Sequence, residues 1–378
     1  MLVPGKRAAA PNCGKGGQVA KAQRKVRRRR IQKSELSNRL LLEVCEQLMA
    51  GEGPTRIAAS LSQTHHLDIS REAVIPLLRE AIRRGFFCIA PPREIEMENL
   101  LGERYLELSG RVRVASGSSL PSENYVAAAA VDQLIRILRH LGDRDRRRVH
   151  LGLGAGMTTV EIAKRLAARL RKERGLPELA LHALTSGFSP DDPSTSPVAF
   201  FGYFEDIATA YHGLFAPAVA GPKDYERIKA LTGVSDAFRR SGEIDVIVTS
   251  LATKEDDHGA LRSIMEKAVL ESQLHELEDS GWVGDVMYRP YSDHGPIDDT
   301  AMVRAMTLFD LPELVRFAAT PEKYVILVAA PCGRCDRTKD RALHPLLCEP
   351  SLKVWTDVVL DWTTATALLA SSNPSQAK

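Results

Sequence analysis

The stretch RRVHLGLGAGMTTVEIAKRLAARL, residues 147–170, constrains the fold of this chain more than any other. Apolar residues alternate between positions 149 and 153, which predicts a buried strand. Glycines then permit a sharp turn and a close approach of other groups to the backbone. Apolar residues near helical spacing follow over 160–170, which predicts a helix. The stretch therefore indicates a strand, a glycine loop and a helix in succession.

The glycine loop offers a binding site for an anion. The first N–H groups of a helix lack internal partners and carry the positive end of the helix dipole, so they suit a phosphate. Gly154 and Gly156 precede these groups, and Met157 and Thr158 begin the helix. The spacing matches neither a P-loop, which ends in Gly-Lys-Ser/Thr, nor the dinucleotide motif G-x-G-x-x-G. From the loop alone, a ligand site and a tight turn without a ligand remain equally open.

Further apolar runs predict more strands of the same sheet. Strands are expected at 111–117, 179–188, 244–252, 325–333 and 353–361, with helices over 124–141 and around 204–213. Helices between strands indicate a parallel α/β sheet with crossover connections. Ligands of such sheets bind beyond the carboxyl ends of the strands. The glycine loop, Ser186-Gly187, Ser250 and Cys332-Gly333 all lie at such ends, which favours a ligand site.

Size and composition limit the class of protein. With 378 residues, the chain is long enough for two or three domains, and 44% hydrophobic and 26% charged residues are typical of a soluble globular protein. No apolar run reaches the ~20 residues that span a bilayer, and the N-terminus lacks a secretory signal. Six scattered cysteines argue against a disulfide framework. We therefore expect a cytoplasmic protein with no membrane partner.

Positive charge is concentrated at the N-terminus. Residues 1–34 contain eleven Lys/Arg and no Asp/Glu, which leaves 40 basic and 48 acidic residues, a net of −8, for the remainder. This composition predicts a disordered basic tail. Such a tail beside a folded domain can follow DNA phosphates. A solvated tail without a partner, or an extension upstream of the real start, remains open.

Residues 35–90 have the pattern of a helix-turn-helix domain. Helices are expected over 35–49, 54–61 and 70–85, followed by a small strand or wing, FFCIA. A short middle helix and a third helix capped by Ser70 are typical of this DNA-binding unit. The connector SQTHHLD is longer than the usual three or four residues, so a three-helix interaction domain remains open. The expected DNA-contacting residues are Arg56, Ser70, Arg71, Glu72 and Arg79.

The order of these motifs resembles the SorC family of sugar-responsive transcriptional regulators over roughly 35–370. The resemblance is carried by LGLGAGMTT, LFAPAVA, IDVIVTSLA, GWVGDV at 281–286, VILVAAPCGRCDRTKDRAL and VVLDWTTATALL. It implies a winged-helix-like helix-turn-helix followed by a parallel-sheet, Rossmann-like domain of the sugar-phosphate isomerase type. The expected divisions are a tail at 1–34, a DNA-binding domain at 35–90, a linker helix at 91–110 and an effector and oligomerisation domain at 111–372.

The resemblance also implies partners and a site. The partners would be operator DNA, a phosphorylated sugar as effector with no cofactor, and further copies of the chain, usually in a tetramer. By position, the effector-binding residues would be Gly154, Gly156, Met157, Thr158, Asp285, Gly333 and Lys339. The loop residues would hold the phosphate, Lys339 would add a charge, and Asp285 would accept hydrogen bonds from sugar hydroxyls. An aspartate that caps a turn is the alternative for Asp285.

The sequence departs from the family pattern at the loop and at the last glycine turn. Ala155 and Met157 stand where larger or polar residues are frequent, and Pro331-Cys332-Gly333 replaces a glycine pair. A different effector or a decayed site therefore remains open. So does a sugar-phosphate-binding protein of the same fold without specific DNA binding.

Two chemical alternatives need separate mention. Cys332, Cys335, His344 and Cys348 could supply four zinc ligands, and the C-x-x-C pair alone could be a redox switch. Pro345 disturbs the helix that would align the last two, so incidental thiols and no metal are favoured. A sugar-phosphate isomerase would need an acid/base group near the substrate carbonyl. Asp245, Asp285 and His294 exist, but no motif pairs them, so we expect no enzyme.

Overall fold

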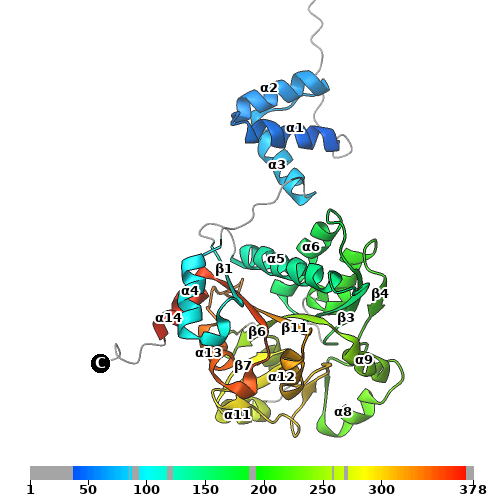
Figure 1. Cartoon of the computed structure of the whole chain (residues 1–378), viewed down its shortest axis with the longest axis vertical. Helices are drawn as coiled ribbons and strands as arrows, with labels where there is room; N and C mark the ends of the chain where they lie inside the picture. Colours follow the sequence, from blue (N-terminus) through cyan, green and yellow to red (C-terminus); the bar gives the residue numbers. More distant parts are fainter. Residues whose placement is uncertain are drawn as a thin grey trace, which may run out of the picture. The chain divides into compact units, whose positions relative to one another are not determined.

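The structure, a computed structural model, describes residues 37–84, 86, 93–116, 122–186, 193–257, 259–267 and 271–371 (Figure 1). The chain divides into two compact units, Met1–Cys88 and Ile89–Lys378. We call the first the head unit and the second the core unit. The expected basic tail, most of the expected wing, and Gly187 lie outside the described residues.

Three helices form the described part of the head unit: α1 (Asn38–Met49), α2 (Pro54–His65) and α3 (Val74–Arg83), the last preceded by a 3₁₀ turn at Arg71–Ala73. The side chain of Ser37 caps α1 by accepting a hydrogen bond from the N–H of Leu40 at 3.1 Å. Leucine, valine, isoleucine and alanine side chains from all three helices form a separate small core. The three helices therefore bury their apolar faces against one another, as the helices of a small domain of about 50 residues must.

The connection between α2 and the third helix is shorter than expected from the sequence. Helix α2 continues to His65, and His66 then takes a left-handed conformation with φ of 54°. The hydroxyl of Ser62 both donates to the carbonyl of Ile69 and accepts from its N–H, which holds the turn against α2. The expected long connector is therefore wrong, because its first four residues belong to the helix. The start of the third helix is a 3₁₀ turn, which places Pro76 in the first α-helical turn, where its missing N–H costs little.

The core unit is a layered α/β structure. Its helices are α4 (Ile95–Arg104), α5 (Ser122–Gly142), α6 (Met157–Leu170), α7 (Pro197–Phe200), α8 (Pro222–Lys229), α9 (Val234–Arg240), α10 (Ala260–Lys267), α11 (Glu271–Asp279), α12 (Leu311–Ala319), α13 (Asp340–Cys348) and α14 (Trp362–Ser371). Its strands are β1 (Val112–Ala115), β2 (Arg148–Leu153), β3 (Glu178–Ala183), β4 (Ala210–His212), β5 (Val219–Ala220), β6 (Val246–Thr253), β7 (Trp282–Val286), β8 (Arg289–Ser292), β9 (Gly295–Pro296), β10 (Arg304–Ala305), β11 (Tyr324–Ala329) and β12 (Asp357–Asp361).

The central sheet has the order β1-β12-β11-β6-β2-β3-β4, and neighbouring strands along it are parallel. The long strand β6 extends beyond this sheet and pairs antiparallel with β7, which continues into β8 and β9. The α/β class with a parallel sheet, expected from the sequence, is therefore confirmed. The antiparallel extension at 282–296 was not predicted.

Helices cover both faces of the sheet (Figure 1). One hydrophobic cluster joins α5 and α6 to the sheet side chains at positions 149, 151, 153, 246 and 248. A second cluster joins α4, α8, α9, α12, α13 and α14 to the opposite face. Burial of a large aliphatic side chain contributes about 1.5–3 kcal/mol, so these two layers dominate the stability of the unit.

Two segments of the core unit differ from expectation. The helix expected around 204–213 is a 3₁₀ turn ending at Phe204 followed by strand β4, because the parallel pairing of β4 with β3 outweighs local helical spacing. The segment expected as a linker helix packs into the core unit. Leu101 and Leu108 are fully buried there, and the carboxylate of Glu98 accepts a hydrogen bond from the N–H of Val114. Among the described helices, none combines the length and apolarity needed to cross a lipid bilayer.

Candidate functional site

Strands β2 and β6 meet at the point where the strand order reverses. From β2 the chain moves outward to β3 and β4, and it then returns to β6 on the other side of β2. Ligands of open α/β sheets bind at the carboxyl ends of the strands at such a switch point. The glycine loop follows β2 and Ser250 lies near the end of β6, so the residues predicted at this edge are brought together.

The glycine loop packs tightly against β6. The N–H of Gly154 donates to the carbonyl of Val248 at 2.9 Å, and a Cβ on Gly154 would lie 2.6 Å from Oγ1 of Thr249. Gly156 has φ of 114°, which strongly favours glycine, and a Cβ there would lie 3.6 Å from Oγ of Ser250. The two glycines therefore serve the close approach of backbone to strand that the sequence indicated.

The amides at the start of α6 are the donors of this site. No side chain caps α6 within the described structure. The N–H of Gly156 is already used, because it donates to the carbonyl of Thr195 at 3.1 Å. The N–H groups of residues 157–159 have no intrahelical acceptor, as in the first turn of any α-helix. They can receive an anion, helped by the helix dipole.

Of the first three side chains of α6, one is exposed and two are buried. Met157 is 46% exposed, whereas Thr158 and Thr159 are buried. The hydroxyl of Thr159 donates to the carbonyl of Ala155 at 3.5 Å. The burial of Thr158 means that an anion at this loop would depend chiefly on backbone donors.

Lys339 and Asp285 flank the end of β6 from the other side. Lys339 immediately precedes α13, is 8% exposed, and donates from Nζ to the carbonyl of Leu251 at 2.7 Å. Asp285 lies on β7, pairs in register with Ala252, and is 4% exposed. Leu251 and Ala252 directly follow Ser250, so a buried cation and a buried carboxyl lie beside the strand end that faces the glycine loop.

Asp285 caps a turn and has a raised pKa. Its Oδ1 accepts a hydrogen bond of 3.2 Å from the N–H of Tyr288, in the β7–β8 turn where Met287 and Tyr288 have positive φ. This is the turn-capping alternative considered from the sequence. Burial raises the pKa of Asp285 to about 7, against the opposing effects of the Tyr288 N–H and the charge of Lys339. The carboxyl therefore changes charge near neutral pH, which an ordinary turn aspartate does not do.

The thiols beside this site do not form the four-ligand set weighed from the sequence. Sγ of Cys332 lies 3.4 Å and Sγ of Cys335 lies 3.9 Å from Oδ1 of Asp256. His344 and Cys348 instead contact each other on α13, with Nε2 and Sγ 3.6 Å apart. Burial raises the pKa of Cys332 to about 11, so its thiol is protonated at neutral pH. Gly333 lies in the same loop, between the two cysteines.

Several groups at the site were not singled out from the sequence. Thr249 lies against the glycine loop at Gly154, and Asp256 contacts the thiols. The carbonyl of Thr195 accepts the hydrogen bond from the N–H of Gly156. Thr249 lies within the segment IDVIVTSLA but was not singled out there, and only the pairing of β2 with β6 and the path of the chain after α6 bring these groups to the site. The strand end at Ser250 was the one available signal.

The residues considered for an isomerase are not assembled. Asp245 precedes β6 and is held by Arg146 and Lys323 at 3.2 and 3.3 Å, whereas Asp285 lies beside the far end of that strand. His294 is exposed in the β8–β9 turn. Asp245 and Asp285 therefore lie at opposite ends of β6 and do not form a pair.

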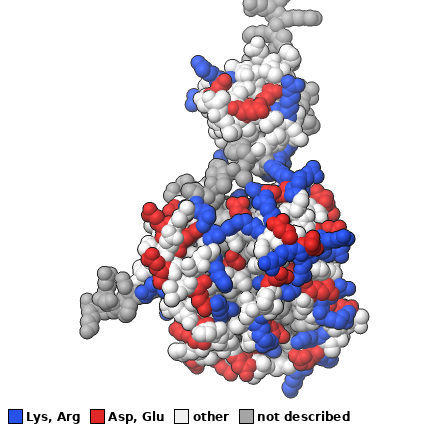
Figure 2. Space-filling model, in the orientation of Figure 1, with Lys and Arg blue, Asp and Glu red and all other residues white. Residues whose placement is uncertain are grey.

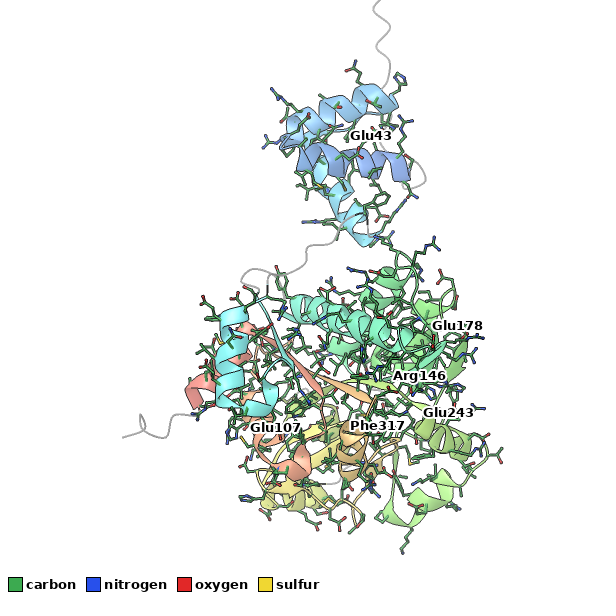
Figure 3. All side chains as sticks on the ribbon, in the orientation of Figure 1. Glu43, Glu107, Arg146, Glu178, Glu243 and Phe317 are labelled. Atoms are coloured by element: carbon green, nitrogen blue, oxygen red, sulfur yellow. The ribbon has the colours of Figure 1, made fainter. Side chains whose placement is uncertain are left out.

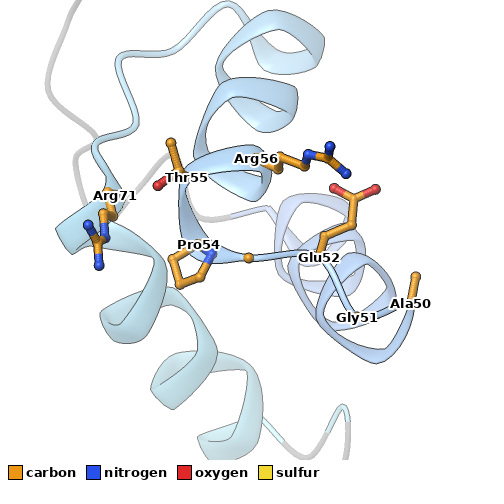
Figure 4. Close-up of a pocket in the computed structure, with 8 residues that line it drawn as sticks. Ala50, Gly51, Glu52, Pro54, Thr55, Arg56 and Arg71 are labelled. Carbon is orange, nitrogen blue, oxygen red and sulfur yellow. The ribbon is translucent and has the colours of Figure 1, made fainter.

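The DNA-contacting candidates are all exposed on the head unit. Arg56 lies in the first turn of α2, Ser70 and Arg71 lie at the start of the 3₁₀ turn, and Arg79 lies on α3. A hollow of about 550 Å³ runs along the α1–α2 turn and is lined by residues 50–56 together with Arg71 (Figure 4). In this view Arg71 lies on the opposite side of the turn from Arg56, whose side chain lies near that of Glu52.

The described part of the head unit carries no excess of positive charge. Residues 37–84 contain six arginines, no lysine and six acidic residues. On the face of the core unit shown in Figure 2, basic and acidic side chains are interspersed. Ion pairs of the core unit include Arg139–Glu173 and Arg171–Asp206. The excess positive charge of the head unit therefore comes from residues 1–34.

Comparison with solved structures identifies the fold. The full-length sorbitol operon regulator SorC from Klebsiella pneumoniae superimposes with a TM-score of 0.56 at 16% identity, over 88% of this chain and 98% of that chain. This chain has the fold of SorC. A transcriptional regulator from Streptococcus pneumoniae matches the SorC-type fold of this chain with a TM-score of 0.56 at 13% identity, over 73% of this chain and 97% of the other.

A putative sugar-binding domain of a transcriptional repressor from Vibrio fischeri has a TM-score of 0.53 at 13% identity, over 74% of this chain and 99% of its own length. No protein-family model and no curated protein sequence matches the chain. The resemblance to SorC-type regulators seen in the sequence is therefore confirmed at the level of the fold.

Proposed function

We propose that this chain is a sugar-responsive transcriptional regulator that binds a phosphorylated sugar at the β2–β6 switch point and operator DNA through its head unit. One observation carries the effector proposal. Gly156, which precedes the amides without an intrahelical acceptor, lies beside Ser250 near the end of β6. The carbonyl of Leu251, the next residue of β6, accepts from Lys339, and Ala252 pairs with Asp285. Solved neighbours of this fold include a sugar operon regulator and a sugar-binding domain of a repressor.

The chemistry of these groups suits a phosphorylated polyol. Backbone N–H groups at a helix start and a lysine ammonium favour a phosphate. A carboxyl accepts hydrogen bonds when ionised and can also donate one when protonated, so Asp285, with a pKa of about 7, suits sugar hydroxyls in either form. Because Lys339 already donates to the Leu251 carbonyl, it would either share its protons with the phosphate or move to it.

The regulation we propose is thermodynamic linkage. An effector that prefers one arrangement of the core units shifts the population toward it, and the affinity for DNA then changes by the same coupling factor. The core unit would also assemble the homo-oligomer, with a tetramer expected from the resemblance. A symmetric oligomer sets the spacing of its DNA heads, and this spacing is what an effector would alter.

A thermal-shift panel of phosphorylated and free sugars tests the effector site. A ligand at 100 times its dissociation constant stabilises the native state by about 2.7 kcal/mol. We expect Lys339→Met to abolish the shift for phosphorylated sugars, while Lys223→Met, a control at an exposed position on α8, leaves it unchanged. Equal losses for free and phosphorylated sugars would show that the phosphate is bound elsewhere.

Binding to the upstream region of the gene tests the DNA proposal. Affinity for this duplex should exceed that for bulk DNA and fall steeply with salt. Deletion of residues 1–34 removes eleven basic residues and should reduce the salt slope strongly. If no duplex is preferred at physiological salt while sugar phosphates still bind, the chain is a sugar-phosphate-binding protein without specific DNA binding. Turnover of a sugar phosphate by the pure protein would identify an isomerase.

A further inference from the structure

Three histidines on neighbouring parallel strands project from the same face of the sheet. His150 lies on β2, His182 on β3 and His212 on β4. The register pairs Gly152 with His182 and His182 with His212. Since side chains alternate along a strand, His150 is on the same face as residue 152 and therefore as the other two histidines. This face is opposite the one covered by α5 and α6.

A carboxylate completes the group. Glu243 lies in the 3₁₀ turn before β6, and its Oε2 is 3.6 Å from Nδ1 of His150. Glu243 is labelled in Figure 3. One ring nitrogen from each histidine and one carboxylate oxygen all lie within 4.8 Å of one another. We call His150, His182, His212 and Glu243 the histidine cluster.

The imidazoles are packed closely enough to share one ion. Nδ1 of His150 is 2.9 Å from Nε2 of His182, and the ring centroids of His182 and His212 are 4.4 Å apart. Zinc–nitrogen and zinc–oxygen distances near 2.0–2.1 Å in a tetrahedral site place ligand atoms about 3.3 Å apart. The two separations within the cluster, 2.9 and 3.6 Å, lie on either side of this value.

The protonation of the cluster suits a metal. Burial lowers the pKa of His182 to about 3, and it lowers the pKa of His150 and His212 below the usual histidine value. The imidazoles are therefore neutral at pH 7, which is the form that binds metals. His182 is 1% exposed, and no hydrogen-bond partner for its Nδ1 is found within the described structure. In this arrangement, the nitrogen of His182 that a metal would take is Nε2, which approaches His150.

We propose that the histidine cluster binds one divalent transition-metal ion, with zinc as the best fit to its three nitrogens and one oxygen. Imidazole with carboxylate is a donor set that zinc accepts, and four donor atoms match its usual coordination number. Glu243 is exposed, so the ion has a route from solvent. The bound ion would join β2, β3 and edge strand β4 to the turn that precedes β6, separately from the proposed effector site.

Nearby positive charges oppose the ion and limit its affinity. Arg240 pairs with Glu243 at 3.3 Å, and Arg148 pairs with Glu178 at 2.9 Å. Glu243 would have to exchange Arg240 for the metal. Since the Arg240–Glu243 pair is exposed, it contributes little to stability, and this exchange is feasible.

The test uses the full-length chain, freed of metal with a chelator and then titrated with Zn²⁺ and Co²⁺. Asp256, Cys332 and Cys335 could also take up zinc, so the titration is repeated in a Cys332→Ser/Cys335→Ser background. We expect one equivalent of zinc in both backgrounds, a rise in melting temperature, and a tetrahedral cobalt spectrum without a thiolate charge-transfer band.

The variant His212→Gln changes a half-buried ligand on the edge strand and should lower zinc affinity at least tenfold. The matched control His275→Gln, at an exposed position on α11, should bind zinc as the wild type does. Glu243→Gln should weaken binding as well. Failure of the Cys332→Ser/Cys335→Ser chain to take up zinc, uptake unaffected by His212→Gln, or a thiolate cobalt spectrum in the wild type would each overturn the proposal.

Discussion

The ammonium of Lys339 lies 2.7 Å from the carbonyl oxygen of Leu251 and within electrostatic reach of the buried carboxyl of Asp285. A cation and an acid that share one buried edge of β6 influence each other's charge. Burial raises the pKa of Asp285 to about 7 against the opposing charge of Lys339, so the stability of the core unit is sensitive to pH.

The first prediction concerns the pH dependence of stability. Asp285 keeps its proton in the folded state up to about pH 7, whereas the unfolded chain loses it near pH 3.8. The folded state therefore binds more protons between these values, and the stability contributed by Asp285 is lost as pH rises through this window. A shift of this size corresponds to roughly 4 kcal/mol for a fully buried group. Urea unfolding at pH 4.5 and 7 measures it.

Asp285→Asn should remove this dependence, because the amide oxygen still accepts from the Tyr288 N–H and carries no charge at any pH. The variant should therefore gain stability relative to wild type between pH 4.5 and 7. Asp293→Asn, at an exposed position in the next turn, should show no such gain. A constant difference between Asp285→Asn and wild type across this range would contradict the assignment.

The second prediction concerns the antiparallel extension. A Cβ on Gly284 would lie 2.6 Å from the carbonyl oxygen of Ala252, 2.7 Å from the hydroxyl of Tyr291 and 2.8 Å from Cβ of Ala342. Gly284→Ala should thus destabilise the chain by about 3 kcal/mol, since a backbone atom and a packed helix must move. Gly202→Ala adds a methyl group where nothing lies within 4 Å and should be nearly neutral. Chemical denaturation compares the two.

The third prediction concerns a buried ion network. The guanidinium of Arg289 lies 3.0 Å from Asp299, and Arg304 lies 2.9 Å from the same carboxylate. Asp299→Ala leaves Arg289 and Arg304 with Asp310 as their remaining carboxylate partner and should cost about 1–3 kcal/mol. Asp298→Ala removes an exposed neighbour and should change stability far less. Similar unfolding midpoints for the two variants would refute the role of Asp299.

The fourth prediction concerns the head unit. Arg56 and Arg71 both line the hollow at the α1–α2 turn. If each neutralises one DNA phosphate, Arg56→Ala and Arg71→Ala should each reduce the slope of log affinity against log salt by about 1. Arg83→Ala, near the other end of the third helix, is the matched control. Fluorescence anisotropy over a salt series gives the slopes, and an unchanged slope in both variants would exclude this surface as the DNA contact.

Local patterns in the sequence were sufficient for much of the fold. Continuous apolar runs predicted β6, β11 and β12, and alternation before a glycine loop predicted β2 and α6. The strands are buried on both faces and the helix along one stripe, so apolar residues occur in continuous runs in the strands and at helical spacing in the helix. Helix α1 was likewise predicted from its apolar stripe, although it begins after a Ser37 cap and not at residue 35 as expected.

The structure decided what depends on contacts between distant segments. Strand β4 became a strand because β3 offers it a pairing edge, although its own spacing suggested a helix. The antiparallel hairpin at β7–β8 brings Asp285 to β6, which no local pattern indicates.

The histidine cluster shows the limit most clearly. His150 and His182 are 32 positions apart in the sequence and belong to no motif, yet their ring nitrogens lie 2.9 Å apart. The spacing of apolar residues along a segment indicates which of its side chains are buried, because each helix or strand turns a regular set of positions toward the core. Which buried residues meet depends on strand order and register, and these are fixed only when the whole sheet has formed.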